Sequence, residues 1–256
     1  MVDEDWVTGN ITLSLGGEPL ELQMTVPAKP VKPRRMLPIF QQMTNSFVGM
    51  TEQAIENVGE KISCHAGCGA CCRQAVPIAE IEAYEIAEMV ENFPEPRRSQ
   101  VKERFEKAWR HFSKIGWLKR LDNCINVSPE EREKVILEYF YEQIACPFLE
   151  NESCSIHETR PLACREYLVT SPFENCSNPS ADKIEMVRLP IKSSETVRQI
   201  TNSENLNRIV NFIPLVFALE WVKNYPDNFP EKTGQQWMAD FFTNLTKSEI
   251  PGKDEG

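Results

Sequence analysis

The chain has 256 residues, and its 38 acidic side chains against 28 Lys and Arg give a formal net charge of −10 at pH 7. So acidic a composition disfavours broad binding to nucleic acid, because that mode of binding releases counterions to a basic surface. The sequence shows neither the pattern of a secretory signal peptide nor the ~20 consecutive apolar residues of a membrane span, so we expect a cytoplasmic protein with no membrane partner.

A β-hairpin is the first predicted element. Apolar and polar residues alternate on both sides of Gly16-Gly17, which is typical of two paired strands. The apolar positions are Ile11, Leu13, Leu15, Leu20, Leu22, Met24 and Val26. Two strands alone are marginal in water, so we expect their apolar face to pack on the helices that follow. Residues 28–35 contain prolines and four basic side chains, which favours an extended connector over a small basic docking segment.

Helical patterns account for most of the remaining chain up to residue 144. One helix is predicted from Pro38 to about Gly59, with an inward face of Phe40, Met43, Phe47, Ala54 and Val58. A second covers Pro77 to Asn92, with Ile81, Tyr84, Ala87 and Val90 inward, and a third carries the stripe Val101, Phe105, Ala108, Phe112 and Ile115. A fourth runs from Pro129 to about Ile144, because Ser128 and Glu131 form a capping box.

The second half of the chain is less regular. Residues 146–176 lack periodicity apart from a turn or two of helix at Pro161 to Tyr167, and residues 184–189 suggest a short strand. An apolar stripe of Leu206, Val210, Ile213, Phe217 and Trp221 predicts a helix that Pro214 kinks or splits. Trp237, Phe241 and Leu245 predict a last helix, and residues 248–256 form a polar tail.

These patterns predict a mainly α fold, in which helices surround an irregular cysteine-rich metal-binding core and a β-hairpin lies at the N-terminus. We expect residues 1–35 to form the hairpin and the basic, proline-rich connector. Residues 36–190 would form the cysteine-cluster domain with its helical insertion, and residues 191–256 the C-terminal helices that pack on the same domain.

Cysteines carry the chemical signal of the sequence. Four thiols fall within residues 64–72, with gaps that let a loop wrap one metal centre. Nine cysteines are an odd number for a disulfide framework, and reduced thiols suit a chain without an export signal. The adjacent thiols of Cys71 and Cys72, at the end of this four-thiol run, favour a polynuclear site or two neighbouring sites, because adjacent side chains diverge. The four are Cys64, Cys68, Cys71 and Cys72.

A second, sparser group of thiols lies about 75 residues downstream of the first. Ligands so far apart are usually assembled around a site that is already nucleated, so we expect helices 77–144 to return the chain to the first cluster. The group comprises Cys146, Cys154, Cys164 and Cys176. Cys124 stands alone between helices and is expected to be a small buried side chain. His65 and His157 are optional ligands that we leave outside the primary site.

Two glycines and three arginines accompany the thiols. Gly67 and Gly69 flank Cys68, where they allow positive φ angles and a close approach of the backbone to a metal. Several thiolates on a divalent ion leave a net negative charge, which the guanidinium groups could compensate. For each arginine, an ordinary surface position is an equal alternative. They are Arg73, Arg160 and Arg165.

The spacing resembles that of a known family. Cys64-x3-Cys68-x2-Cys71-Cys72, the run from Cys146 to Leu149, and the run from Cys154 to Arg165 resemble the YkgJ-type cysteine-cluster family, described as a zinc- or iron-chelating domain. The resemblance spans about residues 63–176. It departs from the family pattern in the three-residue first gap, where the family has two, and at His157, where tyrosine is common. The resemblance implies metal binding.

Three functions are compatible with these observations. The first is a protein that holds iron, an iron–sulfur cluster or zinc for structure or electron transfer, with iron slightly preferred because the four-thiol run is compact. The second is a cluster-dependent enzyme, because the flagellin lysine N-methylases are similar in the cysteine region. No glycine-rich nucleotide loop supports it, since Gly16-Gly17 belongs to the hairpin. The third is an interaction domain built on structural zinc.

Overall fold

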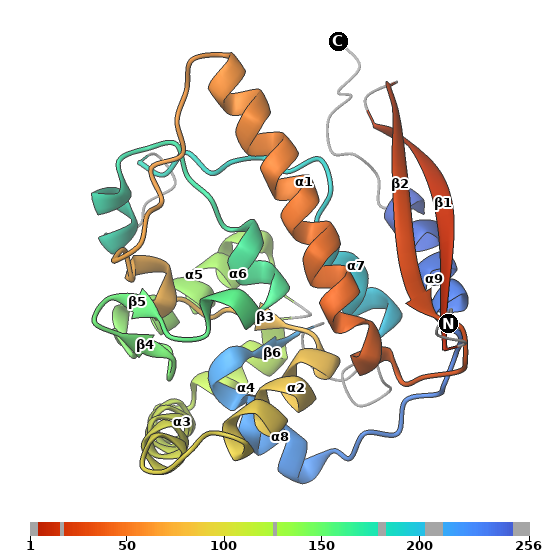
Figure 1. Ribbon diagram of the computed structural model, residues 1–256. Coiled ribbons are helices and arrows are strands. Elements are labelled where there is room, and N and C mark those ends of the chain that lie inside the picture. Colours follow the sequence, from red (N-terminus) through yellow and green to blue (C-terminus); the bar gives the residue numbers. More distant parts are fainter. Residues whose placement is uncertain (1–4, 16–17, 125–126, 179–182, 203–211, 248–256) are drawn as a thin grey trace.

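The computed structural model describes residues 5–15, 18–124, 127–178, 183–202 and 212–247 (Figure 1). As predicted, the fold is mainly α-helical with an N-terminal antiparallel hairpin. Strand β1 (Trp6–Leu15) pairs with β2 (Glu18–Pro27), and the register places Ile11 opposite Leu22 and Leu13 opposite Leu20. The alternating apolar residues therefore share one face of the hairpin, as the sequence indicates.

That apolar face packs on helix α9 (Gly234–Lys247), which confirms the expected support for the hairpin. Figure 1 shows the two strands running beside this helix. Gly234 makes the close approach possible, because a Cβ atom there would lie 2.6 Å from Cβ of Val26. The shared apolar cluster includes Leu13, Leu20, Leu22, Met24, Val26, Trp237, Met238 and Phe241.

The long helix α1 (Leu37–Asn57) belongs to the same core. Phe40 is fully buried and stacks on Phe241 of α9, with ring centroids 5.4 Å apart. Gly59 follows the helix with a φ of +83°, as its predicted stop requires. The predicted inward face is wrong in the last turns, where Ala54 and Val58 are exposed.

The insertion forms a second core. It contains α2 (Glu80–Glu91), α3 (Arg97–Lys114), the short α4 (Trp117–Asn123), which the sequence patterns do not predict, and α5 (Pro129–Tyr141). The stripe of α3 is buried as predicted up to Phe112, whereas Ile115 lies just past the helix and is half-buried. The capping box of α5 is formed by hydrogen bonds of 3.2 and 3.3 Å between Ser128 and Glu131. Helix α2 begins later than predicted, because β3 (Pro77–Ile78) pairs with another strand.

That partner strand corrects a prediction for the C-terminal region. Ile213 and Pro214 form β6, a strand paired with β3, rather than part of a kinked helix, and α8 (Ala218–Asn224) begins after them. Proline lacks the N–H that a helix interior needs but is tolerated in a short strand. Leu206, Val210 and the tail 248–256 lie outside the described residues.

Two short α-helices and two very short strands follow α5 along the chain. Helix α6 (Leu162–Glu166) confirms the predicted helical turns, whereas α7 (Ser193–Ile200) was not predicted. Strands β4 (Leu149–Glu150) and β5 (Ser153–Cys154) form a small hairpin. The predicted strand at 184–189 is wrong, because these residues make only an isolated bridge between Val169 and Met186.

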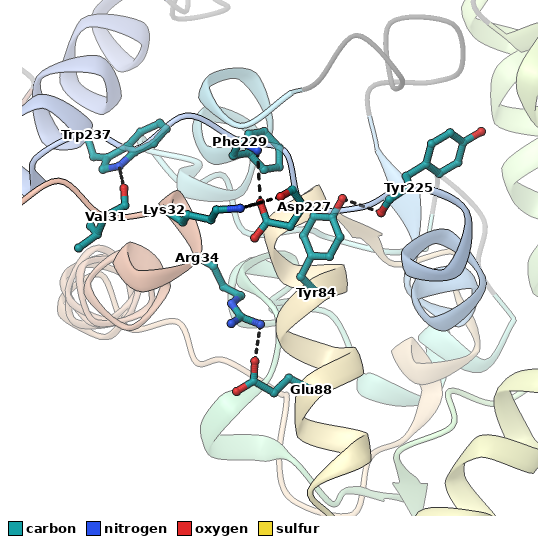
Figure 2. A network of polar contacts seen from close by, with 9 residues as sticks. All are labelled: Val31, Lys32, Arg34, Tyr84, Glu88, Tyr225, Asp227, Phe229 and Trp237. Atoms are coloured by element: carbon teal, nitrogen blue, oxygen red, sulfur yellow. Dashed lines mark hydrogen bonds and ion pairs between the residues drawn. The ribbon is translucent and has the colours of Figure 1, made fainter.

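Polar contacts fasten the connector to the rest of the fold (Figure 2). Nζ of Lys32 donates to the carbonyl oxygen of Asp227 at 2.6 Å, and Arg34 pairs with Glu88 of α2 at 2.5 Å. The indole of Trp237 donates to the carbonyl oxygen of Val31 at 3.0 Å. Lys32 and Arg34 thus bind other parts of the same chain, which favours a connector over a docking segment. No helix within the described residues is both long and apolar enough to cross a membrane.

Candidate metal centre

The first cysteine segment is anchored to the end of the second. Ser63 donates from its backbone N and its hydroxyl to the carbonyl oxygen of Val169, at 3.0 and 3.2 Å, and from the hydroxyl to that of Ser171 at 2.5 Å. The chain then turns at Gly67, whose φ is +89° as predicted. A 3-10 helix, Ala70–Arg73, follows and carries Cys71 and Cys72.

Gly69 serves close packing rather than a positive φ, which corrects the expectation for this residue. Its φ is −92°, which any residue can adopt. A Cβ atom there would clash with the carboxylate of Glu152 and lie 2.9 Å from Cδ1 of Leu149. Arg73 donates to the carbonyl oxygen of Gly69 at 2.9 Å. It also donates to both carboxylate oxygens of Glu152, at 2.7 and 2.9 Å. The two cysteine segments thus touch at Gly69.

A backbone hydrogen bond joins the two segments directly. The N–H of Cys146 donates to the carbonyl oxygen of Cys72 at 2.7 Å. From there the chain enters the β4–β5 hairpin, where Cys154 pairs with Leu149. The insertion therefore does return the chain to the first cysteine run, as the spacing of the sequence led us to expect.

Glu82 positions the next cysteine, and sequence reasoning missed it. This carboxylate is 2% exposed and accepts hydrogen bonds of 2.8 Å from the N–H groups of Ala79 and Leu162. It thereby ties the N-terminus of α2 to that of α6, which carries Cys164. The available signal was a glutamate between the apolar residues Ile81 and Ala83, at the third position of a helix.

The protonation of the thiols reflects their crowding. Burial raises the pKa of Cys146 to about 12 and that of Cys176 to about 11, and it raises the pKa of Cys164 well above its usual value. A hydrogen bond from Cys72 lowers the pKa of Cys71 to about 7 and raises that of Cys72. Without a cation to offset their charge, Cys146, Cys164 and Cys176 therefore favour the protonated form, whereas Cys71 ionises more readily.

The donor set suits a thiophilic metal, although its ligands are not drawn together in this structure. All nine cysteines are free thiols. Among the described residues, no three Cys, His, Asp or Glu side chains meet at the spacing of ligands around one ion. Protonated thiols have no reason to converge on a point, whereas zinc and iron bind the thiolate form and release its proton. The chemistry of the cluster thus fits such a metal, and the side chains must rotate to close a site.

The three arginines near the cysteines have different roles. Arg160 acts on the thiols: burial raises the pKa values of Cys64 and Cys154, and the charge of Arg160 partly opposes that rise. The same charge adds to the hydrogen bond from Cys72 in lowering the pKa of Cys71. Arg165 is 4% exposed, and it donates to Oδ1 of Asn45 at 2.9 Å and so fastens α6 to α1. The side chain of Arg73 instead serves the contact at Gly69. Charge compensation is therefore best supported for Arg160.

The remaining candidates lie at the edge of the cluster or away from it. The ring of His65 packs edge-on against Phe173, with centroids 4.4 Å apart, and His157 lies on the surface beside Arg160. Cys124 is 1% exposed and belongs to the core of the insertion, in agreement with its expected packing role.

A hollow of about 370 Å³ opens beside β5. Its lining includes Cys154, the polar side chains of Arg97 and His157, and the apolar side chains of Met89 and Phe93. Ordinary solutes can therefore reach the region of Cys154, one of the eight candidate ligands.

Comparison with known proteins identifies the cysteine-rich region. Residues 63–188 match the model of the CxxCxxCC family, described as a "putative zinc- or iron-chelating domain". This is the family that the cysteine spacing resembles. Neither a curated protein nor a solved structure gives a significant match.

Proposed function

We propose that this CxxCxxCC domain holds iron, as ions or as an iron–sulfur cluster, through the thiolates of both cysteine segments, and that zinc is the alternative occupant. The proposed ligands are Cys64, Cys68, Cys71, Cys72, Cys146, Cys154, Cys164 and Cys176. The observation that supports this proposal most is the 2.7 Å hydrogen bond from the backbone N–H of Cys146 to the carbonyl oxygen of Cys72, which brings the two cysteine segments together.

The preference for iron follows from the number and crowding of the thiols. A mononuclear zinc site uses at most four ligands, whereas eight cysteines and a vicinal pair suit a polynuclear centre or more than one centre. Thiolates in such numbers carry negative charge, which the guanidinium group of Arg160 partly offsets. Electron transfer and structural support are both compatible with this arrangement.

Anaerobic purification followed by a visible spectrum and analysis of metal and sulfide tests the proposal. A brown protein with iron and inorganic sulfide supports a cluster, and a colourless protein with stoichiometric zinc supports the alternative occupant. A chain that binds neither metal, as purified or after anaerobic loading with ferrous or zinc ions, would refute metal binding.

Matched cysteine variants assign the metal to the proposed ligands. Cys68→Ser should lower the metal content of the purified protein. Cys124→Ser should leave it unchanged, because this thiol is buried in the insertion core, where it donates to the carbonyl oxygen of Arg120 at 3.3 Å. Equal metal content in wild type and Cys68→Ser would remove this residue from the ligand set.

A further inference from the structure

The hollow beside β5 combines apolar side chains with an arginine. Its volume of about 370 Å³ lies in the range of pockets that hold small organic molecules. Three of the lining side chains are apolar: Met89 of α2, Phe93 just after that helix, and Ile156 just after β5. The hollow also contains a cation, Arg97, which is the first residue of α3. Pockets of this kind bury the apolar body of a ligand and orient it through a few polar groups.

Arg97 is held at the hollow by contacts that leave its charge unpaired. Its guanidinium group lies over the ring of Phe93, 4.2 Å from the centroid, and its Nη2 donates to the carbonyl oxygen of Ser155 at 3.2 Å. Among the described residues it forms no ion pair with a carboxylate, whereas the other three arginines of the helix each pair with a glutamate. Those three are Arg98, Arg104 and Arg110. A half-buried guanidinium group positioned in this way can bind a carboxylate through its remaining N–H groups.

Two buried polar atoms at the hollow support this interpretation. Nε of Arg97 and the hydroxyl oxygen of Ser155 are both buried, and no described residue provides either of them with a hydrogen-bond partner. Most buried polar atoms in folded proteins are hydrogen-bonded, because leaving one unpaired costs free energy. A small rotation of either side chain would let a ligand in the hollow complete these hydrogen bonds.

The charges around the hollow favour a ligand with one negative charge. A second cation lies close by, because the guanidinium group of Arg160 contacts the ring of His157, which lines the hollow. One carboxylate opposes the two arginines: Glu158 lines the hollow as well, and its side chain is 98% exposed. Two cations and one anion leave an excess of one positive charge, which matches a monocarboxylate better than a phosphate dianion.

We propose that the hollow binds a small monocarboxylate with an apolar body. Its carboxylate accepts hydrogen bonds from Arg97, and its body packs on Met89, Phe93 and Ile156. Cys154 lines the hollow too, so the ligand lies beside one of the proposed metal ligands. The proposal goes beyond metal binding and does not depend on which metal the thiols hold.

Fluorine NMR with 4-fluorobenzoate tests this proposal. The full chain, purified anaerobically with the metal that it carries, is titrated with 4-fluorobenzoate and separately with the neutral 4-fluorobenzamide. Wild type should bind the benzoate with a dissociation constant on the order of 1 mM, as expected for a ligand of this size. The amide should bind at least about tenfold more weakly, because it lacks the charge that pairs with Arg97. Arg97→Gln should bind the two compounds equally weakly.

Two further variants separate ligand binding from an effect on the fold. Arg104→Gln is the matched control on the same helix, because this arginine pairs with Glu150 and does not line the hollow. It should bind the benzoate as wild type does. Glu158→Gln removes the opposing charge at an exposed position and should tighten benzoate binding about twofold. Circular dichroism of each variant verifies its helices.

The contrary outcomes are equally definite. Failure of wild type to bind the benzoate at about 20 mM would overturn the proposal, and so would equal affinity for the benzoate and the amide. Unchanged benzoate binding by Arg97→Gln, or an equal loss in Arg104→Gln, would also overturn it. If Arg97→Gln does not fold, Glu158→Gln replaces it, and an unchanged affinity in that variant would overturn the proposal. These outcomes concern the hollow alone and leave the proposed metal binding as it stands.

Discussion

The helical core around α1 and α9 and the two cysteine segments are built by different means. The core buries large apolar side chains: Met36, Phe40, Trp237 and Phe241 are each at most 1% exposed. The cysteine segments contain only 3-10 turns, two-residue strands and the short α6, and cross-segment hydrogen bonds connect them. Burial of apolar surface can stabilise the first region alone, whereas the second lacks enough of it and depends on polar links and, in our proposal, on metal.

Removal of the metal should separate the two regions most clearly. A chelator, or the Cys68→Ser variant, should leave residues 146–176 sensitive to protease, because thiolate–metal bonds no longer hold this irregular backbone. The hairpin and α9 should stay protected. Mass spectrometry of limited digests measures cleavage in residues 146–176 and in the hairpin and α9. Cleavage that rises equally in both regions, or in neither, would contradict the separation.

Truncation of a side chain in the helical core should destabilise the core and leave metal binding unchanged. Trp237→Ala removes a 1% exposed indole and its hydrogen bond to Val31, so the free energy of unfolding should fall by about 3–5 kcal/mol. The metal content of the folded fraction should not change. Denaturant unfolding with metal analysis measures the two effects, and Val58→Ala, at a 75% exposed site, should be nearly neutral. A loss below about 1 kcal/mol for Trp237→Ala would show that the core does not depend on it.

Glu82 links helix α2 to the cysteine-bearing helix α6, and its substitution should remove that link. Glu82→Ala leaves the buried N–H groups of Ala79 and Leu162 without an acceptor, so the free energy of unfolding should fall by about 2–3 kcal/mol. Metal affinity should also fall, because α6 carries Cys164. Glu91→Ala on the same helix removes only an exposed ion pair with Lys102 and should cost about 0.5 kcal/mol or less. Equal losses in both variants would exclude the linking role of Glu82.

Substitution of one glycine in each region should change the stability of the protein in opposite directions. Gly69→Ala should destabilise the protein by about 1–3 kcal/mol, because the added methyl group overlaps Glu152 and Leu149. Gly49→Ala, in the interior of α1, meets no atom within 4 Å and should stabilise it by about 0.5–1 kcal/mol. Thermal unfolding of both variants measures the signs. Stabilisation by Gly69→Ala would show that the two segments do not pack closely there.

Local patterns predicted the elements that depend on neighbours in the sequence. The cap at Ser128 and the stripe of α3 specify their helices, because the capping hydrogen bonds and helical periodicity involve residues only a few positions apart. The prediction failed where distant partners decide the conformation. Pro214 is in a strand because Pro77 pairs with it, and Gly69 is a glycine because Glu152 lies against it.

The chemistry of the site can be read from the residues alone: eight clustered thiols, with spacings that resemble a metal-chelating family, in a chain rich in amphipathic helices. Which cysteine segments become neighbours depends on how the whole chain folds. Cys146 reaches Cys72 because the intervening helices fold back on themselves, and Cys164 is positioned by a carboxylate from α2. Spacing along a chain constrains only short loops, whereas contacts across 70 residues or more are set by the packing of every element between them.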